Sequence, residues 1–204
     1  MYPDLYILRH GETTWNLQGR YQGRKDSPLT EKGRSQALVQ RALLNGLDNL
    51  PSKVFVSPLG RVIETARLAV TLGDQPVIDE RLQELSFGSW EGSLREDIAR
   101  NIHMSSTDRS WAFNSPDGET FGMIATRVQE FLDDLDQPAI IVTHGITSIV
   151  LRGLWLGLDQ AKMLELSTDQ GCIYHLSNGT ETVSYTHLRA HETRHDLVCR
   201  LLLE

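Results

Sequence analysis

Two histidines of this chain stand where an imidazole can do chemistry. His10 lies in Arg9-His10-Gly11 and His144 lies in Thr143-His144-Gly145, and each triplet directly follows a short apolar run. An imidazole titrates near neutral pH, so its unprotonated form is available as a nucleophile or base in the cell. The guanidinium of Arg9 keeps its charge and binds two oxygen atoms of one anion at once. These residue types are candidates for a site that handles an anionic group.

The elements that must position these residues alternate between strand and helix. Short continuous apolar runs are typical of strands buried on both faces, and three occur here: Leu5–Leu8, Val54–Val56 and Ala139–Val142. Helices are expected over Glu31–Leu44, Gly60–Leu72, Phe121–Leu135 and Ile146–Leu156. A late strand over Cys172–Leu176 precedes a turn at Ser177-Asn178-Gly179. The alternation predicts one α/β domain with a mainly parallel sheet.

Polar residues follow the three apolar runs directly. The runs end in Arg9-His10-Gly11, Ser57-Pro58 and Thr143-His144-Gly145. Open α/β sheets bind ligands outside the carboxyl ends of their strands. The predicted architecture therefore favours His10 and His144 over the other histidines as site residues.

The composition excludes several classes of protein. A length of 204 residues with 40% apolar residues suffices for one sizeable core and rules out a fully disordered chain. The net charge of −7 argues against non-specific nucleic-acid binding, which needs a basic surface. No apolar run approaches the ~18 residues of a membrane span, and the first four residues lack the features of a signal peptide. Two cysteines make no disulfide framework, so we expect a cytoplasmic single-domain protein.

The C-terminal stretch Val183–Glu204 resembles one reading frame of a common sequencing adapter. It contains His191-Glu192-Thr193-Arg194-His195, an H-E-x-x-H pattern that on a helix would place two imidazoles and a glutamate around a zinc ion. Because the adapter resemblance covers this pattern and no third ligand stands out downstream, we do not interpret it as a metal site. We expect the domain to span residues 1–182, a non-native tail to span 183–204, and no metal site in the protein.

Four ordered blocks carry a resemblance to a known family over nearly all of residues 4–176. They are Leu8–Asn16 continued by Gln22-Gly23 and Asp26–Thr30, then Ser57–Arg61 with Glu64–Ala66, then Glu84-Leu85 with Gly88 and Trp90–Gly92, and finally Thr143–Gly145. In this order they resemble the histidine phosphatase superfamily, also called the phosphoglycerate mutase-like family. The resemblance implies a three-layer α/β/α sandwich, phosphoryl transfer through a phosphohistidine, and no required metal or cofactor.

The resemblance also implies catalytic roles. His10 is the implied nucleophile, with its second ring nitrogen protonated and bonded to nearby backbone, and a covalent intermediate eases a very slow hydrolysis. Arg9 and Arg61 are implied to stabilise the charge that spreads over the phosphoryl oxygens, with a protonated His144 as a further contact. Glu84 is the implied proton donor to the leaving oxygen and later takes a proton from the attacking water.

Substrate-binding positions follow from the same resemblance. Asn16 offers an uncharged amide donor, and Gln22 and Gly23 match positions that lie beside the substrate in relatives. The backbone of Gly145 can approach a phosphate closely. Relatives often have a second glycine where this chain has Ile146.

The segment Gly92–Phe121 bears on which reaction the chain performs. Mutase relatives carry a longer insertion after the Glu84 region, whereas this segment has about 30 residues. The short connection favours a phosphomonoesterase of the histidine acid phosphatase type. Phosphoglycerate mutase-type transfer remains the alternative. A catalytically silent phosphate-binding module is a further one, although His10, Arg61 and Glu84 are all present.

The substrate is expected to be a small phosphorylated metabolite. Sugar phosphates, phosphoglycerates, nucleotides and cobalamin-precursor phosphates are all compatible, because the local field of a basic pocket outweighs the net negative charge. Trp111 is a candidate for lining that pocket, and Glu91 is interpreted as a surface charge. Three arginines are candidates for contact with an acidic substrate: Arg95, Arg100 and Arg109.

Overall fold

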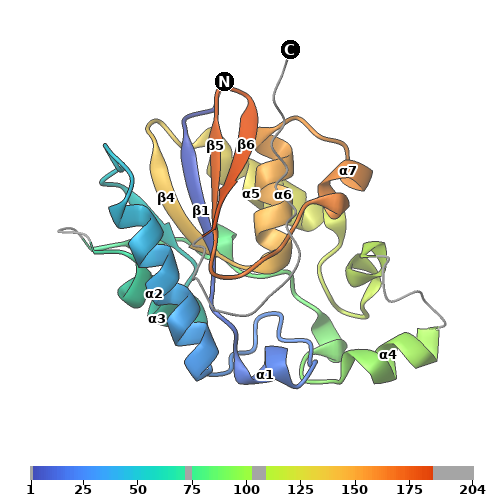
Figure 1. The fold of residues 1–204 in the computed structure, drawn as a ribbon. Coiled ribbons are helices and arrows are strands. Elements are labelled where there is room, and N and C mark those ends of the chain that lie inside the picture. The colour runs from blue at the N-terminus through green and yellow to red at the C-terminus, as the bar shows by residue number, and fades with distance from the viewer. Residues whose placement is uncertain (1, 72–74, 103–108, 186–204) are drawn as a thin grey trace, which may run out of the picture.

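The chain folds into one sheet with helices on both faces (Figure 1). The structure is a computed structural model that describes residues 2–71, 75–102 and 109–185. Its strands are β1 Leu5–Arg9, β2 Val54–Val56, β3 Val77–Ile78, β4 Ala139–Thr143, β5 Ile173–Ser177 and β6 Thr180–Ser184. Its helices are α1 Thr14–Leu17, α2 Glu31–Asn45, α3 Gly60–Ala69, α4 Arg95–Ile102, α5 Phe121–Asp133, α6 Gly145–Trp155 and α7 Gln160–Glu165.

The sheet is mainly parallel, as the sequence predicts. The strand order is β3-β2-β4-β1-β5-β6, and the first four strands run parallel to one another. The last two form an antiparallel hairpin, with β5 antiparallel to β1. Asn178 and Gly179 close this hairpin with φ values of 50° and 76°, the left-handed backbone that a tight hairpin turn requires. The expected domain boundary between Thr182 and Val183 falls inside β6.

Both faces of the sheet are covered, which gives the expected three-layer sandwich. Side chains of a strand alternate between its faces, so Leu5 and Ile7 of β1 enter one hydrophobic cluster and Leu8 enters the other. Helices α5 and α6 cover the first face, and α2 and α3 cover the second (Figure 1). Every residue of β4 is buried, which explains its continuous apolar run.

The four predicted helices are present with boundaries close to those expected. Thr30 caps α2, where its Oγ1 accepts the N–H of Gly33 at 3.0 Å. Thr120 caps α5 in the same way through the N–H of Met123. Helix α3 ends at Ala69, before the expected Leu72, because Val70 adopts an extended backbone.

The sequence interpretation missed the short elements. They are β3, α1, α4, α7, β6 and the 3₁₀ turns Glu80–Leu82, Gly88–Trp90 and Ser110–Asn114. Elements of one or two turns contain too few residues for a periodic apolar pattern. Across the described parts of the chain, no helix is long and apolar enough to cross a membrane.

The loop after β1 packs directly on the first turn of α2. A Cβ on Gly11 would lie 2.2 Å from the carbonyl oxygen of Gly33, and a Cβ on Gly33 would lie 2.0 Å from the carbonyl oxygen of Glu12. The N–H of Thr30 also donates to the Glu12 carbonyl at 2.9 Å. Two backbones in such contact leave room for hydrogen atoms only, so α2 fixes the loop that follows His10.

We expect Gly33→Ala to lower the free energy of unfolding by about 2 kcal/mol or more, since the new methyl group meets backbone that cannot move aside. Urea unfolding followed by circular dichroism measures the change. Gly122→Ala in the first turn of α5 is the matched control: its Cβ meets nothing closer than 3.9 Å, and the alanine should stabilise the helix by up to about 1 kcal/mol. Equal midpoints for the two variants would contradict the packing described.

Candidate active site

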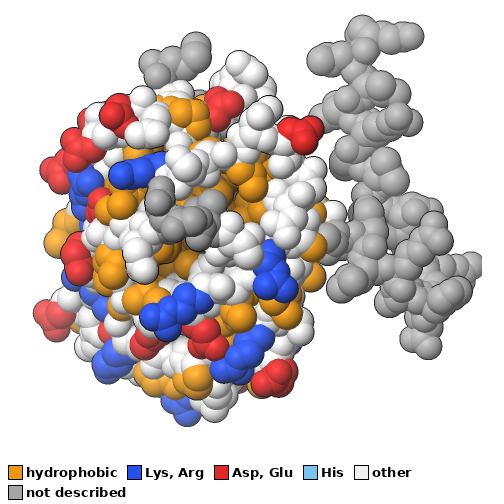
Figure 2. Space-filling view, turned by 90° about the vertical axis from the view of Figure 1, so that its left-hand side faces the viewer, with side chains coloured by type: hydrophobic (Ala, Val, Ile, Leu, Met, Phe, Trp, Pro, Cys, Tyr) orange, Lys and Arg blue, Asp and Glu red, His pale blue; other side chains and the backbone are white. Residues whose placement is uncertain are grey.

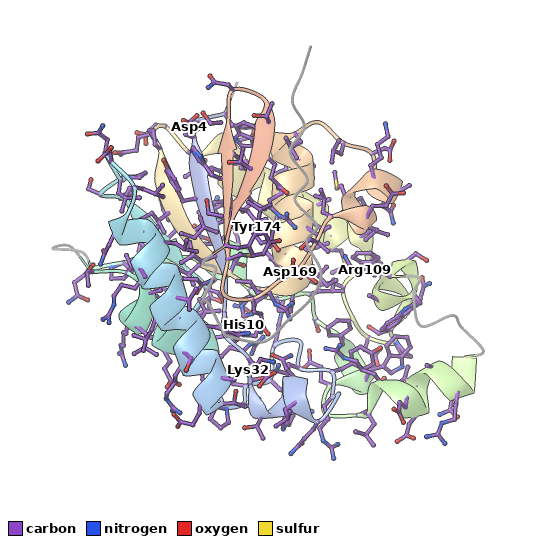
Figure 3. All side chains as sticks on the ribbon, viewed as in Figure 1. Asp4, His10, Lys32, Arg109, Asp169 and Tyr174 are labelled. Carbon is purple, nitrogen blue, oxygen red and sulfur yellow. The ribbon has the colours of Figure 1, made fainter. Side chains whose placement is uncertain are left out.

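The register of β1 and β4 brings the two candidate histidines together. Arg9, the last residue of β1, pairs with Thr143, the last residue of β4, so His10 and His144 each directly follow a strand. The N–H of His10 donates to the Thr143 carbonyl at 3.0 Å. The two rings are 5.3 Å apart, centre to centre, at an angle of 64°. Figure 3 shows His10 at the end of the sheet opposite to Asp4. The predicted site therefore forms at the carboxyl ends of the strands.

A cavity of about 380 Å³ opens at this end of the sheet. Every predicted catalytic or substrate-binding residue except His144 lines it: Arg9, His10, Asn16, Gln22, Gly23, Arg61, Glu84 and Gly145. His144 has no exposed surface and packs behind His10. The structure thus gathers residues from four separate blocks of the sequence in one place.

The His10 imidazole is held in a single tautomer. Its Nδ1 lies 2.7 Å from the Gly11 carbonyl oxygen, which can only accept, so Nδ1 carries the proton. Nε2 accepts the Nε–H of Arg61 at 3.3 Å. Burial, followed by the charges of Arg61 and Arg9, lowers the pKa of His10 well below its usual value. The expected hydrogen bond from the ring to the backbone is present. The lowered pKa means that the ring is neutral and that Nε2 carries no proton.

Arg61 is a buried cation whose side chain is 1% exposed. Its Nη1 donates to the Lys25 carbonyl at 2.9 Å and to Asp26 Oδ1 at 3.0 Å, and Nη2 donates to the Gly23 carbonyl at 2.8 Å. A guanidinium has five N–H groups, so these contacts leave the Nε–H beside His10 and one Nη2–H. The Nε–H donates to His10 Nε2 at 3.3 Å, so one Nη2–H is left for an oxygen atom of an anion that approaches Nε2.

Arg9 enters the cavity from the end of β1. Its Nη1 donates to the Thr168 carbonyl, and its Nε is buried without a hydrogen-bond partner among the described residues. The guanidinium packs against Gly145, where a Cβ would lie 3.4 Å from the central carbon of the Arg9 guanidinium. Burial lowers the pKa of Arg9 and of Arg61, and the negative charge of Glu84 opposes that lowering in both cases.

Glu84 lies at the N-terminus of α6, where backbone N–H groups favour a carboxylate. Its Oε1 accepts the N–H groups of Leu85 and Thr147 at 3.0 and 3.1 Å, and the Thr147 hydroxyl, which donates to the Gln83 carbonyl at 2.6 Å, lies 3.2 Å from it. Its Oε2 accepts one, from the N–H of Ile146 at 3.3 Å. Only the backbone N–H of Ile146 takes part in this contact, so the isoleucine side chain, where relatives often have glycine, does not prevent it. Oε2 is the oxygen with capacity left to carry a proton.

His144 is paired with Ser57. Its Nε2 lies 2.7 Å from Ser57 Oγ, and its Nδ1 is buried without a partner in the described structure. Burial and the charge of Arg61 lower the pKa of His144 well below its usual value. The sequence resemblance implies that His144 is protonated when phosphoryl oxygens lie beside it, and this stays a prediction.

The predicted substrate-binding residues are fixed by polar contacts. Asn16 Oδ1 accepts from the N–H of Thr13 at 3.2 Å and from Gln170 Nε2 at 3.4 Å, so its Nδ2 is the donor left to offer a ligand. Gln22 donates to Thr13 Oγ1 at 2.7 Å and accepts from Ser27. Gly23 adopts φ 55°, and its carbonyl holds Arg61.

The outer part of the cavity comes from the segment between Gly92 and Phe121. Arg95, Arg109 and Trp111 line it, whereas Arg100 lies on the surface paired with Asp97. Arg109 donates to the Leu166 carbonyl at 2.7 Å. Figure 2 shows acidic and basic side chains interspersed on the face that it views. Four arginines in one cavity therefore make it a local basic site on an acidic protein.

Two residues that hold predicted catalytic side chains were not predicted from the sequence, and the assignment of Glu91 was wrong. Asp26 and Ser57 lie within the motifs of the family resemblance, but no local pattern shows that they contact Arg61 and His144. Glu91 is not a simple surface charge. Its Oε1 accepts the N–H groups of Arg24 and Phe87 at 3.0 and 3.1 Å, so it joins two loops at the cavity.

No group of three potential metal ligands occurs in the described ranges. The H-E-x-x-H residues 191–195 lie outside those ranges. A buried unprotonated imidazole whose Nε2 faces an arginine donor is suited to nucleophilic chemistry on an anion.

Comparison with known proteins places this arrangement in a family. A sequence profile of the histidine phosphatase superfamily (branch 1) matches residues 5–190. A protein named probable phosphoglycerate mutase GpmB from Enterobacter sp. (strain 638) is 38% identical over 168 residues, 76% of this chain and 75% of that protein. The adenosylcobalamin/alpha-ribazole phosphatase of Escherichia coli (strain K12) is 33% identical over 178 residues, 82% of this chain and 86% of that protein.

A solved structure agrees with these sequence matches. Mycobacterial glucosyl-3-phosphoglycerate phosphatase Rv2419c, determined with VO3, superposes with a TM-score of 0.74 at 27% identity and covers 89% of this chain and 96% of that one. The chain belongs to the histidine phosphatase superfamily.

We expect the His10 imidazole to titrate well below pH 6.5, because burial and two arginines disfavour its protonated form. Its ring proton shift, followed by NMR from pH 8 to the acid limit of the folded protein, measures this. The His10→Ala variant assigns the resonance, and free histidine in the same buffer is the reference. A His10 midpoint at or above that of free histidine would contradict the environment described.

Proposed function

We propose that the protein is a phosphomonoesterase that hydrolyses a small phosphorylated metabolite through a phosphohistidine on His10. The observation that carries this proposal is the state of the His10 ring. Its Nδ1–H is held by the Gly11 carbonyl, and its unprotonated Nε2 accepts the Nε–H of Arg61, which has one Nη2–H left. A phosphoryl oxygen that takes over the Arg61 Nε–H is stabilised by it and frees the Nε2 lone pair for attack.

In the first half of the reaction, His10 Nε2 attacks phosphorus and the bond from phosphorus to the ester oxygen breaks. Negative charge on the equatorial oxygens is met by Arg61 and by the unpaired Nε–H of Arg9. Glu84 protonates the departing oxygen from Oε2, the carboxyl oxygen with a single hydrogen bond. The N–H groups of Leu85 and Thr147 donate to its Oε1 and keep the carboxyl group in place.

In the second half, water replaces the leaving group. Glu84, now ionised, takes a proton from this water as its oxygen attacks phosphorus and the bond from phosphorus to Nε2 breaks. Inorganic phosphate leaves, and His10 returns to its starting tautomer. By this scheme the reaction is that of a histidine acid phosphatase-type monoester hydrolase, and the chain needs no metal for it.

Relatives and the cavity bear on the substrate. The names of the relatives concern alpha-ribazole, phosphoglycerate and glucosyl-3-phosphoglycerate chemistry. A second candidate function, phosphoglycerate mutase-type transfer, is favoured by the match at 38% identity. We prefer the phosphatase because the Gly92–Phe121 connection is short, and we propose action in the cytoplasm on a small phosphorylated substrate.

We also propose that the enzyme is contained in residues 1–182 and that Val183–Glu204 is adapter-derived. All residues that line the cavity lie between Arg9 and Thr168. The proposal therefore assigns no role in the chemistry to the C-terminal stretch.

We expect wild-type protein to release phosphate from p-nitrophenyl phosphate or from members of a metabolite phosphate panel without added metal. His10→Ala should lower kcat by about 10³-fold or more, since the nucleophile is lost. His175→Ala, which removes a partly buried ring on β5 that stacks on Tyr6, is the control and should retain activity. Hydrolysis that survives in His10→Ala would contradict the proposal. Isomerisation of phosphoglycerates without net phosphate release would support the mutase instead.

Glu84→Gln should separate two kinds of substrate. An alkyl phosphate needs a proton on its leaving oxygen, so kcat should fall by about 10²-fold or more. The p-nitrophenolate ion leaves without one, and its release in the pre-steady state should change far less. Parallel measurements on glycerol phosphate and p-nitrophenyl phosphate test this. Equal losses on both substrates would show that Glu84 does not donate the proton.

A further inference from the structure

The pairing of His144 with Ser57 has a consequence for the chemistry of the site. Both side chains are fully buried, and Ser57 Oγ lies 2.7 Å from His144 Nε2. The second nitrogen of the ring, Nδ1, is buried without a hydrogen-bond partner within the described ranges. A buried polar atom of this kind is uncommon in folded proteins and calls for a reason.

The single hydroxyl hydrogen of Ser57 decides where the ring proton sits. Ser57 Oγ already accepts the N–H of Leu59 at 3.4 Å. In the part of the chain that the structure describes, the acceptor within reach of its hydrogen is His144 Nε2. If the hydroxyl donates to Nε2, the neutral ring must carry its proton on Nδ1. If Nε2–H donated to Ser57 Oγ instead, the hydroxyl hydrogen of Ser57 and the Nδ1 lone pair of His144 would both be buried and unpaired.

The backbone places Ser57 firmly for this task. Its N–H donates to the Val142 carbonyl at 3.2 Å, so Ser57 continues the pairing of β2 with β4 beyond the last strand residue. Pro58 follows and restricts the backbone of Ser57 to extended conformations. The same pair of strands thus carries Ser57 and His144 to one end of the sheet.

We propose that Ser57 is a positioning residue that holds His144 in its Nδ1–H tautomer, so that Nδ1–H donates to an oxygen of the phosphoryl group at His10. This inference rests on the proposed function for the identity of the anion. The rings of His10 and His144 are 5.3 Å apart, which leaves an oxygen on a phosphoryl at His10 within hydrogen-bond reach of the neighbouring ring. Ser57 itself touches no substrate in this scheme.

The wild-type full chain provides the first test. Two-bond proton–nitrogen correlation spectra distinguish the tautomers of a neutral imidazole, and His144→Asn assigns the ring signals. We expect His144 to show a protonated Nδ1 and an unprotonated Nε2. A wild-type spectrum with the proton on Nε2 of His144 would overturn the proposal.

Ser57→Ala provides the second test, with Ser148→Ala as its matched control. Ser148 is also a buried serine near the site, and its Oγ has no partner among the described residues, so its removal breaks no hydrogen bond. We expect Ser57→Ala to move His144 toward the Nε2–H tautomer and to weaken binding of inorganic phosphate about tenfold. Ser148→Ala should keep the wild-type tautomer and bind phosphate within about twofold of the wild type.

The two tests separate this inference from the proposed function. Unchanged tautomer and unchanged phosphate affinity in Ser57→Ala would overturn the positioning role, even if the protein is an active phosphatase. An Nδ1–H tautomer that depends on Ser57, in a protein that binds phosphate but hydrolyses no monoester, would support the positioning role and contradict the proposed function. Changed stability alone, with the tautomer kept, counts against the proposal.

Discussion

The parallel pairing of β1 with β4 is the constraint on which the site depends. Because Arg9 is opposite Thr143, the residues that follow each strand, His10 and His144, must emerge side by side. Side chains of these strands enter two hydrophobic clusters on opposite faces, so a shift of one residue would turn apolar side chains to the wrong face. The core that stabilises the sheet therefore also sets the geometry of the two imidazoles.

A buried cation next to a neutral imidazole is the electrostatic core of the site. Removing the Arg61 guanidinium from water is costly, and it is tolerated because two carbonyl groups and Asp26 accept its hydrogen bonds. Burial and the same positive charge lower the pKa of His10 and keep Nε2 unprotonated. Glu84 also lines the cavity, and its negative charge favours the charged form of Arg61. In the proposed reaction, stabilisation of an incoming anion and activation of the nucleophile thus arise from one set of contacts.

The segment between Gly92 and Phe121 gives the cavity its individual character. Arg95, Arg109 and Trp111 line the cavity and belong to a connection in which the sequence predicted no regular structure. Helix α4 begins there at Arg95. The relatives named as a phosphatase and as a mutase both match over most of the chain.

Local patterns in the sequence were enough to predict the main strands, the four long helices and the end of the sheet at which the site forms. Apolar runs and helical periodicity report burial, and burial of β4 or α5 is a property of consecutive residues. Short elements such as α1 and α4 escaped, because one or two turns carry no period. Asp26, Ser57 and Glu91 escaped for a different reason: each acts through a partner far away in the chain. The sequence by itself determined which residue types can transfer a phosphoryl group and which strand ends carry them. Only the tertiary structure decided which nitrogen of His10 carries the proton, since that depends on how the folded backbone turns the Gly11 carbonyl toward the ring.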